Sequence, residues 1–251
     1  MLTSDAQQAA GQIREWIDSS TCAVAFTGAG ISTESGIPDF RSPGGVWSKY
    51  RTVYFDEFCE SADARHEYWR QKAEAHQEFA DASPNVTHRT LADWEASGNL
   101  HGVITQNIDG LHQQAGSKRV QELHGTAREV SCLDCGWRDV VDGWVNQFLE
   151  TDQVPECPEC TGRLKHATVS FGQSLPPDVL DTAMQWARQS DLFLALGSSL
   201  VVEPAASLPR IAASSGARLV IINRDETPLD GIATLTVRAA LGDVFEALND
   251  E

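Results

Sequence analysis

Four short apolar runs constrain the fold of this chain of 251 residues more than any other feature. They are CAVAF (22 to 26), GVIT (102 to 105), LFLALG (192 to 197) and RLVIIN (218 to 223). Stretches with helical spacing separate them. Apolar runs this short, without polar alternation, are typical of parallel strands that are covered on both faces. The sequence therefore predicts an α/β fold built on a parallel sheet.

Helical periodicity fills much of the chain between these runs, with two interruptions. Residues 3 to 19 predict an amphipathic helix capped by Thr3 or Ser4. Helical spacing returns between about 56 and 97 and breaks at Ser-Pro-Asn, 83 to 85. From 127 to 166 the chain has little periodicity and is punctuated by Cys, Pro and Gly. We therefore expect an inserted module there.

The chain is strongly acidic, with 36 Asp and Glu residues, 19 Lys and Arg residues and a formal net charge of -17. Such a surface repels nucleic acid and anionic lipid, so basic partners are favoured. Only four of the basic residues are Lys, and this composition raises the hypothesis of a salt-rich cytoplasm. The segment MLTSDAQQAAGQIREW lacks a secretion-signal pattern, and no run of about 18 apolar residues is present. We expect a cytoplasmic protein without a membrane partner.

Two Cys-x-x-Cys pairs give the clearest metal signal. Cys132 and Cys135 are separated by 21 residues from Cys157 and Cys160, close to the spacing of two thiolate turns that complete a tetrahedral zinc site. Four Cys ligands leave no open position for a substrate, so we expect one structural Zn²⁺ per chain. Redox or disulfide pairing is the alternative. The module from 126 to 166 holds eight acidic and four basic residues, which argues against a DNA-binding zinc ribbon.

The first apolar run leads directly into a glycine turn, Gly28-Ala29-Gly30, followed by Ile, Ser and Thr33. Two glycines of the G-x-G-x-x-G pattern are present, and Thr33 takes the place of the third. Because a turn from strand to helix directs backbone N–H groups at an anion, the segment predicts a phosphate site. A plain glycine turn is the alternative for this motif alone.

Three further polar clusters follow strand ends: TQNIDGLH (105 to 112), GSSL (197 to 200) and Asn223-Arg224. The carboxyl ends of parallel strands line the ligand crevice of an open sheet, so we expect these clusters to converge. Helix capping is the alternative for each cluster taken singly. His124 lies at the junction with the inserted module and could act as a general base, although a solitary histidine is usually structural.

In chain order, these motifs resemble the sirtuins, NAD-dependent protein lysine deacylases. The resemblance rests on GAGIS-x-ESGIPDFR, TQNIDGLHQQAG, ELHG, the Cys pairs, FG-x-SLP, GSSL and the late Asn-Arg, and it extends from about 20 to 245. It implies a Rossmann-like domain that binds NAD and an inserted smaller zinc-binding and helical domain. The implied boundaries are 1–30, 96–126 and 167–251 for the Rossmann-like domain, 31–95 for the cofactor-binding loop and helical module, and 127–166 for the zinc module.

The resemblance also implies which residues contact NAD and the acyl-lysine peptide. The NAD contacts would be Gly28, Ala29, Gly30, Thr33, Asp39, Phe40, Arg41, Gln106, Asn107, Ile108, Asp109, His124, Gly197, Ser198, Ser199, Asn223, Arg224 and Leu241. Val169 and Phe171 would line the acyl-lysine tunnel. The 171 to 175 stretch and the segment after GSSL would clasp the peptide as an added strand.

The chemistry implied by the resemblance begins when the acyl oxygen of the substrate attacks C1′ of the nicotinamide ribose. Nicotinamide leaves, and an alkylimidate linked to ADP-ribose remains. Asn107 and Asp109 would hold the carboxamide, and His124 would act as general base on a ribose hydroxyl. Water then releases deacylated lysine and O-acetyl-ADP-ribose. The expected partners are proteins or peptides that contain acetyl-lysine.

Some positions depart from the family pattern near the peptide site. His166 and Ala167 lie near the usual Arg-Pro, and Gln173 replaces Glu. Tyr68 is followed three residues later by Gln71, whereas the branch that removes succinyl groups has Arg there. We therefore expect neutral acyl groups, chiefly acetyl.

The sequence is also compatible with other functions. If the changes from 166 to 173 spoil the peptide site, NAD cleavage alone would give a mono-ADP-ribosyltransferase or an NAD hydrolase. A nucleotide-sensing binding module is a further alternative, although mere binding does not need the set Asn107, Asp109 and His124. A dehydrogenase is disfavoured because the third glycine is missing.

Overall fold

The computed structural model describes residues 1–3, 5–38 and 51–250. The strands are β1 (Leu2–Thr3), β2 (Ala23–Thr27), β3 (Gly102–Thr105), β4 (Val120–Glu122), β5 (Gly125–Cys132), β6 (Arg138–Val140), β7 (Leu164–Thr168), β8 (Leu192–Leu196), β9 (Arg218–Ile222) and β10 (Leu235–Val237). The α-helices are α1 (Ala6–Ser19), α3 (Phe55–Glu60), α4 (Ala62–Asp81), α5 (Val86–Ser97), α6 (Leu111–Ala115), α7 (Asp142–Thr151), α8 (Pro177–Gln189), α9 (Ser207–Ser214) and α10 (Leu241–Asn249). Two 3₁₀ helices are η1 (Ala29–Ser35) and η2 (Asp230–Ile232).

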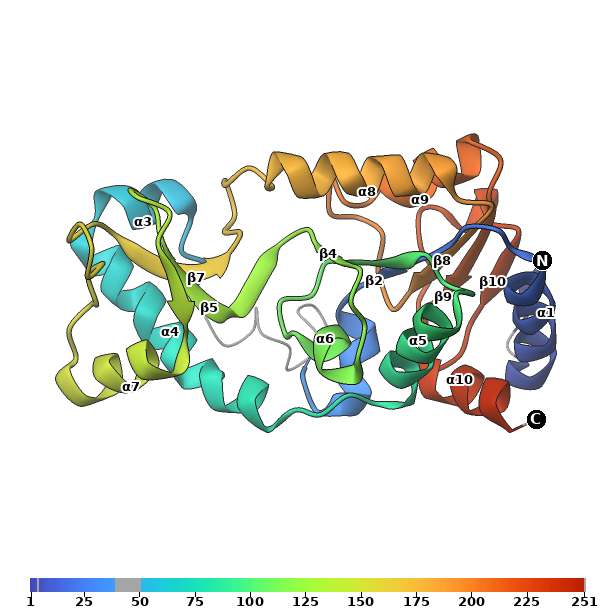
Figure 1. Cartoon of the computed structure of the whole chain (residues 1–251), viewed down its shortest axis with the longest axis horizontal. Helices are drawn as coiled ribbons and strands as arrows, with labels where there is room; N and C mark the ends of the chain where they lie inside the picture. The colour runs from blue at the N-terminus through green and yellow to red at the C-terminus, as the bar shows by residue number, and fades with distance from the viewer. Residues whose placement is uncertain (4, 39–50, 251) are drawn as a thin grey trace.

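Two sheets organise these elements (Figure 1). The first has seven strands in the order β1-β10-β9-β8-β2-β3-β4, all paired in parallel. The second is a three-stranded antiparallel sheet in the order β6-β5-β7. We call the parallel sheet with its helices the large lobe, and the antiparallel sheet with α3, α4 and α7 the small lobe. The predicted α/β fold is confirmed.

The four apolar runs of the sequence are the four central strands of the parallel sheet, in the order β9-β8-β2-β3. After β2 the chain adds β3 and β4 on one side, and later it adds β8, β9 and β10 on the other. The strand order therefore reverses between β2 and β8. A crevice outside the carboxyl ends of two such strands is where open α/β sheets bind ligands.

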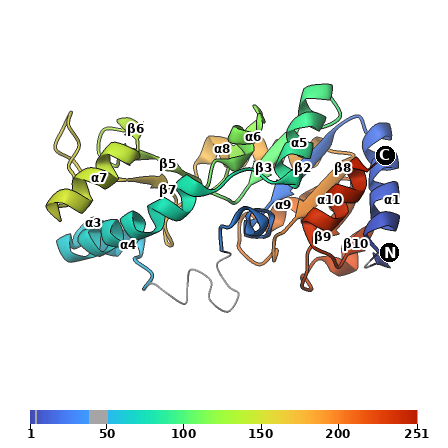
Figure 2. The same ribbon diagram turned by 90° about the horizontal axis from the view of Figure 1, so that it is seen from below.

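Helices cover both faces of the parallel sheet, as Figures 1 and 2 show. Ala23 and Ala25 of β2 pack toward α1 and α10, whereas Val24 and Phe26 pack toward α8 and α9. Every residue of β2 is buried. Burial on both faces explains why the strand sequences show no polar alternation.

The first helix begins later than expected. It starts at Ala6, and the side chain of Asp5 caps it by accepting a hydrogen bond from Gln8 N at 3.0 Å. The expected cap at Thr3 or Ser4 is wrong, because Thr3 belongs to β1 and pairs with Val237 at the edge of the sheet.

The small lobe has its own apolar core, in which α3, α4 and α7 pack on β5 and β7 (Figure 1). Trp69 is fully buried there, and its indole N–H donates to the carbonyl of Leu164 at 3.1 Å. The predicted break at 83 to 85 separates α4 from α5, whose cap is Asn85. No helix within the described ranges is long and apolar enough to cross a membrane.

Candidate functional site

The glycine turn after β2 packs directly against the turn after β8. Gly28 N donates to the carbonyl of Leu196 at 3.0 Å, and Gly30 N donates to that of Gly197 at 2.8 Å. A Cβ on Gly28 would lie 2.8 Å from the Gly197 oxygen, and one on Gly30 would lie 2.7 Å from Gly197 Cα. Only glycine allows these contacts, so both residues have a role in joining the turns that does not depend on a ligand.

A buried polar network lies beside this junction. Ser32 Oγ donates to Asp109 Oδ2 at 2.7 Å, and Asn107 Nδ2 donates to Ser32 Oγ at 3.0 Å. The second carboxylate oxygen, Asp109 Oδ1, accepts from Leu111 N at 2.9 Å. Ser32, Asn107 and Asp109 are all buried. Their side chains are therefore held in fixed positions, and Ser32, which joins them, was missed by the sequence analysis.

Beneath this network lies a second buried layer. Thr27 Oγ1 is 2.8 Å from Thr105 Oγ1 and 2.9 Å from His112 Nε2, and Asn107 N donates to Thr105 Oγ1 at 3.0 Å. Burial, with a smaller effect of the neighbouring histidine, lowers the pKa of His112 to about 3. The imidazole of His112 is therefore neutral at pH 7. This second layer places no charge next to the network of Ser32, Asn107 and Asp109.

His124 is oriented by the backbone. Its Nδ1 lies 2.8 Å from the carbonyl oxygen of Gln106. A carbonyl can only accept, so Nδ1 carries the proton and Nε2 has the free lone pair. Burial lowers the pKa of His124, and the hydrogen bond to the Gln106 carbonyl opposes this effect. The ring is therefore neutral near pH 7, in the tautomer that a general base requires.

Contacts tie this histidine to both other parts of the candidate site. Gln106 Nε2 donates to Ser198 Oγ at 2.7 Å, which joins the clusters after β3 and β8. On the other side, Val169 N donates to the carbonyl of His124 at 2.8 Å. The clusters after β3 and β8 therefore lie together, as the strand ends predict.

The remaining predicted residues differ in their exposure. Leu241 is buried at the start of α10, and Asn223 Nδ2 donates to the carbonyl of Asp225 at 2.9 Å. Ala29, Thr33, Ile108, Ser199 and Val169 are half-buried, whereas Arg224 and Phe171 are exposed. Asp39, Phe40 and Arg41 lie outside the described residues.

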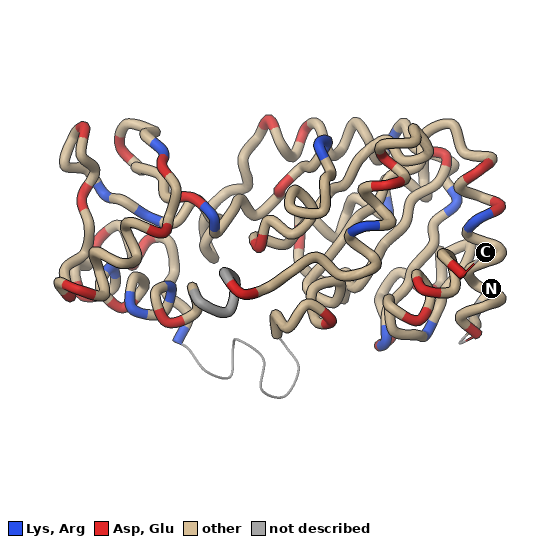
Figure 3. Tube along the Cα trace, turned by 60° about the horizontal axis from the view of Figure 1, so that its bottom comes forward, with Lys and Arg blue, Asp and Glu red and all other residues tan. Residues whose placement is uncertain are grey.

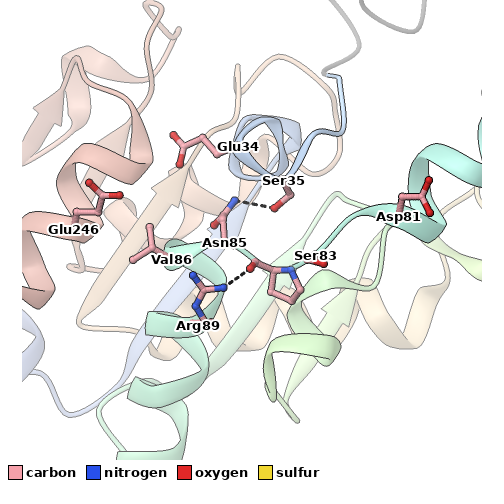
Figure 4. A pocket seen from close by; sticks show the side chains of 9 residues that line it. Glu34, Ser35, Asp81, Ser83, Asn85, Val86, Arg89 and Glu246 are labelled. Carbon is pink, nitrogen blue, oxygen red and sulfur yellow. Dashed lines mark hydrogen bonds between the residues drawn. The ribbon is translucent and has the colours of Figure 1, made fainter.

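A cavity of about 520 Å³ opens elsewhere, between η1, α5 and α10 of the large lobe and the end of α4 (Figure 4). It is lined by Glu34, Ser35, Asp81, Ser83, Pro84, Asn85, Val86, Arg89 and Glu246. Three carboxylates against one guanidinium would repel a pyrophosphate, and no residue predicted to contact NAD lines this space. The carboxyl edge of the sheet is therefore the better candidate.

The four cysteines of the small lobe form one cluster. Cys132 Sγ lies 3.6 Å from Cys160 Sγ, and Cys135 Sγ lies 3.7 Å from Cys157 Sγ. With Zn–S bonds of about 2.3 Å, two ligands of a tetrahedral site are about 3.8 Å apart. All four sulfurs lie within 4.8 Å of one another, and all four cysteines are free of disulfide bonds. The geometry therefore fits one zinc ion.

A model of the Sir2 family matches residues 28–204. A curated NAD-dependent protein deacetylase of Rhodopseudomonas palustris is 47% identical over 98% of each chain. One from Haloarcula marismortui is 41% identical and covers 94% of this chain and 92% of its own.

Solved structures are similar over the same length. A structure described as Sir2 with a p53 peptide and NAD+ has a TM-score of 0.84 and 41% sequence identity, covering 95% of each chain. Another, a Sir2 variant with deacetylated p53 peptide and 3'-O-acetyl ADP ribose, has a TM-score of 0.86 and 40% identity. It covers 95% of this chain and 96% of that one.

Proposed function

Because this chain belongs to the Sir2 family, we propose that it is an NAD-dependent protein lysine deacetylase whose reaction takes place at the carboxyl edge of the large lobe. The observation that supports this location best is the buried network of Ser32, Asn107 and Asp109 beside a correctly protonated His124. Simple nucleotide binding does not need a fixed amide, a fixed carboxylate and a base together.

NAD, when bound, supplies the ADP-ribose group to which the acetyl group is transferred as nicotinamide leaves. Gly28, Ala29, Gly30, Thr33, Ser198 and Ser199 would contact its phosphates and riboses, and Leu241, Asn223 and Arg224 its adenosine part. Asn107 and Asp109 would hold the nicotinamide carboxamide. This role is supported by the fixed positions of the two side chains, because Ser32 hydrogen-bonds to both of them before any ligand binds.

His124 would remove a proton from a ribose hydroxyl, which then attacks the acyl carbon. The free Nε2 lone pair supports this role, since the Gln106 carbonyl holds the other nitrogen protonated. Activity should depend on neutral His124. Because burial lowers its pKa, activity should persist below pH 6.5 and fall at more acidic pH as the ring becomes protonated.

The zinc ion would hold the turns of the small lobe together and take no part in the chemistry, since four thiolates fill its coordination shell. Val169 and Phe171 would contact the acyl-lysine, and acetyl would be the preferred acyl group. A cytoplasmic location also remains a prediction. It is supported by two further free thiols, Cys22 and Cys59, which suit a reducing compartment.

Product analysis tests this function directly. Purified protein is incubated with NAD, with and without an acetyl-lysine peptide, and the products are identified by mass. We expect release of nicotinamide only with peptide, matched one for one by deacetylated lysine and O-acetyl-ADP-ribose. Nicotinamide release that ignores the peptide would instead indicate an NAD hydrolase or ADP-ribosyltransferase. NAD binding without any release would indicate a binding module.

A further inference from the structure

An aromatic pair is exposed where the start of α3 meets the segment after β7. Tyr54 is 50% exposed and Phe171 is 46% exposed. Their ring centroids are 6.2 Å apart, with an angle of 53° between the ring planes. Tyr54 and Phe171 are the only aromatic residues among the exposed large hydrophobic residues of the described part of the chain. We call this pair the aromatic ledge.

The backbone holds the ledge in place although its rings are exposed. Phe55 N donates to the carbonyl of Phe171 at 2.9 Å, which ties α3 to the segment predicted to bind the peptide. Tyr54 N donates to Glu57 Oε2 at 3.1 Å. A Cβ on Gly172 would lie 4.0 Å from the Tyr54 ring. A fixed backbone with exposed rings suits recognition of a ligand better than stabilisation of the core.

The surroundings of the ledge are acidic. Residues 51 to 63 include four carboxylates and one Arg, and that Arg51 pairs with Glu57 at 3.1 Å. Asp56, two residues from Tyr54, is exposed. The face of an aromatic ring attracts a cation through its quadrupole, and nearby carboxylates add to this attraction. A cationic side chain is therefore the ligand that this surface fits.

We propose that the ring of Tyr54, packed beside Phe171, binds a lysine or arginine side chain that flanks the acyl-lysine of the substrate. This inference rests on the proposed function, because Phe171 is also predicted to contact the acyl-lysine. Backbone pairing along 171 to 175 would bind peptides with little regard to sequence. The ledge adds a preference for basic neighbours, worth about two- to fivefold in peptide affinity at an exposed site.

Three replacements of one residue separate the cation contact from other effects. Tyr54→Phe keeps the aromatic face, Tyr54→Leu keeps an apolar side chain without it, and Tyr54→Ala removes both. The readout is equilibrium binding of fluorescent acetyl-lysine peptides that carry Arg or Gln at flanking positions, measured by anisotropy. Thermal unfolding of each variant serves as the folding control.

We expect the parent and Tyr54→Phe to bind the Arg peptide more tightly than the Gln peptide. In Tyr54→Leu and Tyr54→Ala the ratio of the two affinities should fall about two- to fivefold. Binding of the Gln peptide should hardly change. Equal losses on both peptides, or a preference kept by Tyr54→Leu, would overturn the inference. Because peptide binding is measured without turnover, the cation contact and the proposed deacetylase function are tested separately. Preference for the Arg peptide without any deacetylated product would refute the proposed function and leave the ledge in place.

Discussion

The candidate site depends on one side chain inside the glycine motif, that of Ser32. Ser32 is separated by 75 residues from Asn107 and by 77 from Asp109, yet its hydroxyl hydrogen-bonds to both side chains. The sequence indicated Asn107 and Asp109 because they follow a strand end. It could not indicate Ser32, since only the pairing of β2 with β3 brings the two segments together.

Replacing Ser32 by Ala should slow the reaction without unfolding the protein. The change removes a donor to the buried Asp109 carboxylate, and hydrogen bonds to charged groups contribute about 1.5–3 kcal/mol. We therefore expect kcat to fall about ten- to a hundredfold, while KM for the peptide stays near the parent value. Steady-state kinetics at saturating NAD measures both.

Ser97→Ala is the matched control, because Ser97 is exposed at the end of α5 and far from the network. It should leave the kinetics unchanged. If Ser32→Ala retained the parent kcat, the network would have no part in catalysis.

At the element scale, the long apolar runs were predictable and the short strands were not. Burial on both faces identifies β2, β3, β8 and β9. In contrast, β1, β4 and β10 have only two or three residues each, too few for any periodicity to appear. The domain boundaries taken from the family resemblance stay a prediction.

The zinc cluster should determine whether the small lobe folds. Cys160→Ala removes a ligand of the proposed site, so the metal content should fall well below one zinc per chain and the small lobe should lose its packing. Metal analysis and near-ultraviolet circular dichroism of Trp69 and its neighbours would report this. Cys59→Ala is the control, since Cys59 lies outside the cluster. Full zinc content in Cys160→Ala would contradict the assignment of four ligands.

Lys165 should make the free energy of unfolding depend on pH in the alkaline range. Its ammonium group is buried in the small lobe, 5.1 Å from the centre of the Tyr68 ring. Burial, with a smaller effect of Lys72, lowers its pKa to about 7, against about 10.4 in the unfolded chain. Between these values the unfolded chain binds more protons, so stability rises with pH, by up to about 1.4 kcal/mol per pH unit for this group.

Urea unfolding at pH 7, 8 and 9 tests this dependence. Lys165→Met should give a flatter slope than the parent because it removes the titrating group while keeping a flexible apolar side chain. Parallel slopes in the two proteins would show that Lys165 is not the source.

In the whole molecule, Asp and Glu residues are distributed along the chain in both lobes (Figure 3). The amino-acid composition predicted the negative net charge, but it could not predict how the two lobes are arranged. The large lobe has an apolar cluster on each face of its sheet, and the small lobe has a separate one. The proposed site lies where His124 and Val169 connect the parallel sheet to the small lobe.

Salt should stabilise the protein as a whole. With a net charge of -17, the acidic side chains repel one another in the folded state. Salt weakens this repulsion, because the screening length falls from about 30 Å at 0.01 M salt to about 3 Å at 1 M. We expect the unfolding temperature to rise between these concentrations of KCl. A steady fall over the same range would contradict the hypothesis of adaptation to a salt-rich cytoplasm.

Comparing the parent with His124→Ala at saturating NAD and acetyl-lysine peptide tests whether His124 is the base of an NAD-dependent deacetylation. Deacetylated lysine is counted by mass, and His66→Ala serves as a control because His66 pairs with Asp152 in the small lobe. We predict that His124→Ala forms product about a hundred- to ten-thousandfold more slowly, while the control keeps the parent rate. A rate in His124→Ala near that of the parent would contradict the proposed role of His124 as general base.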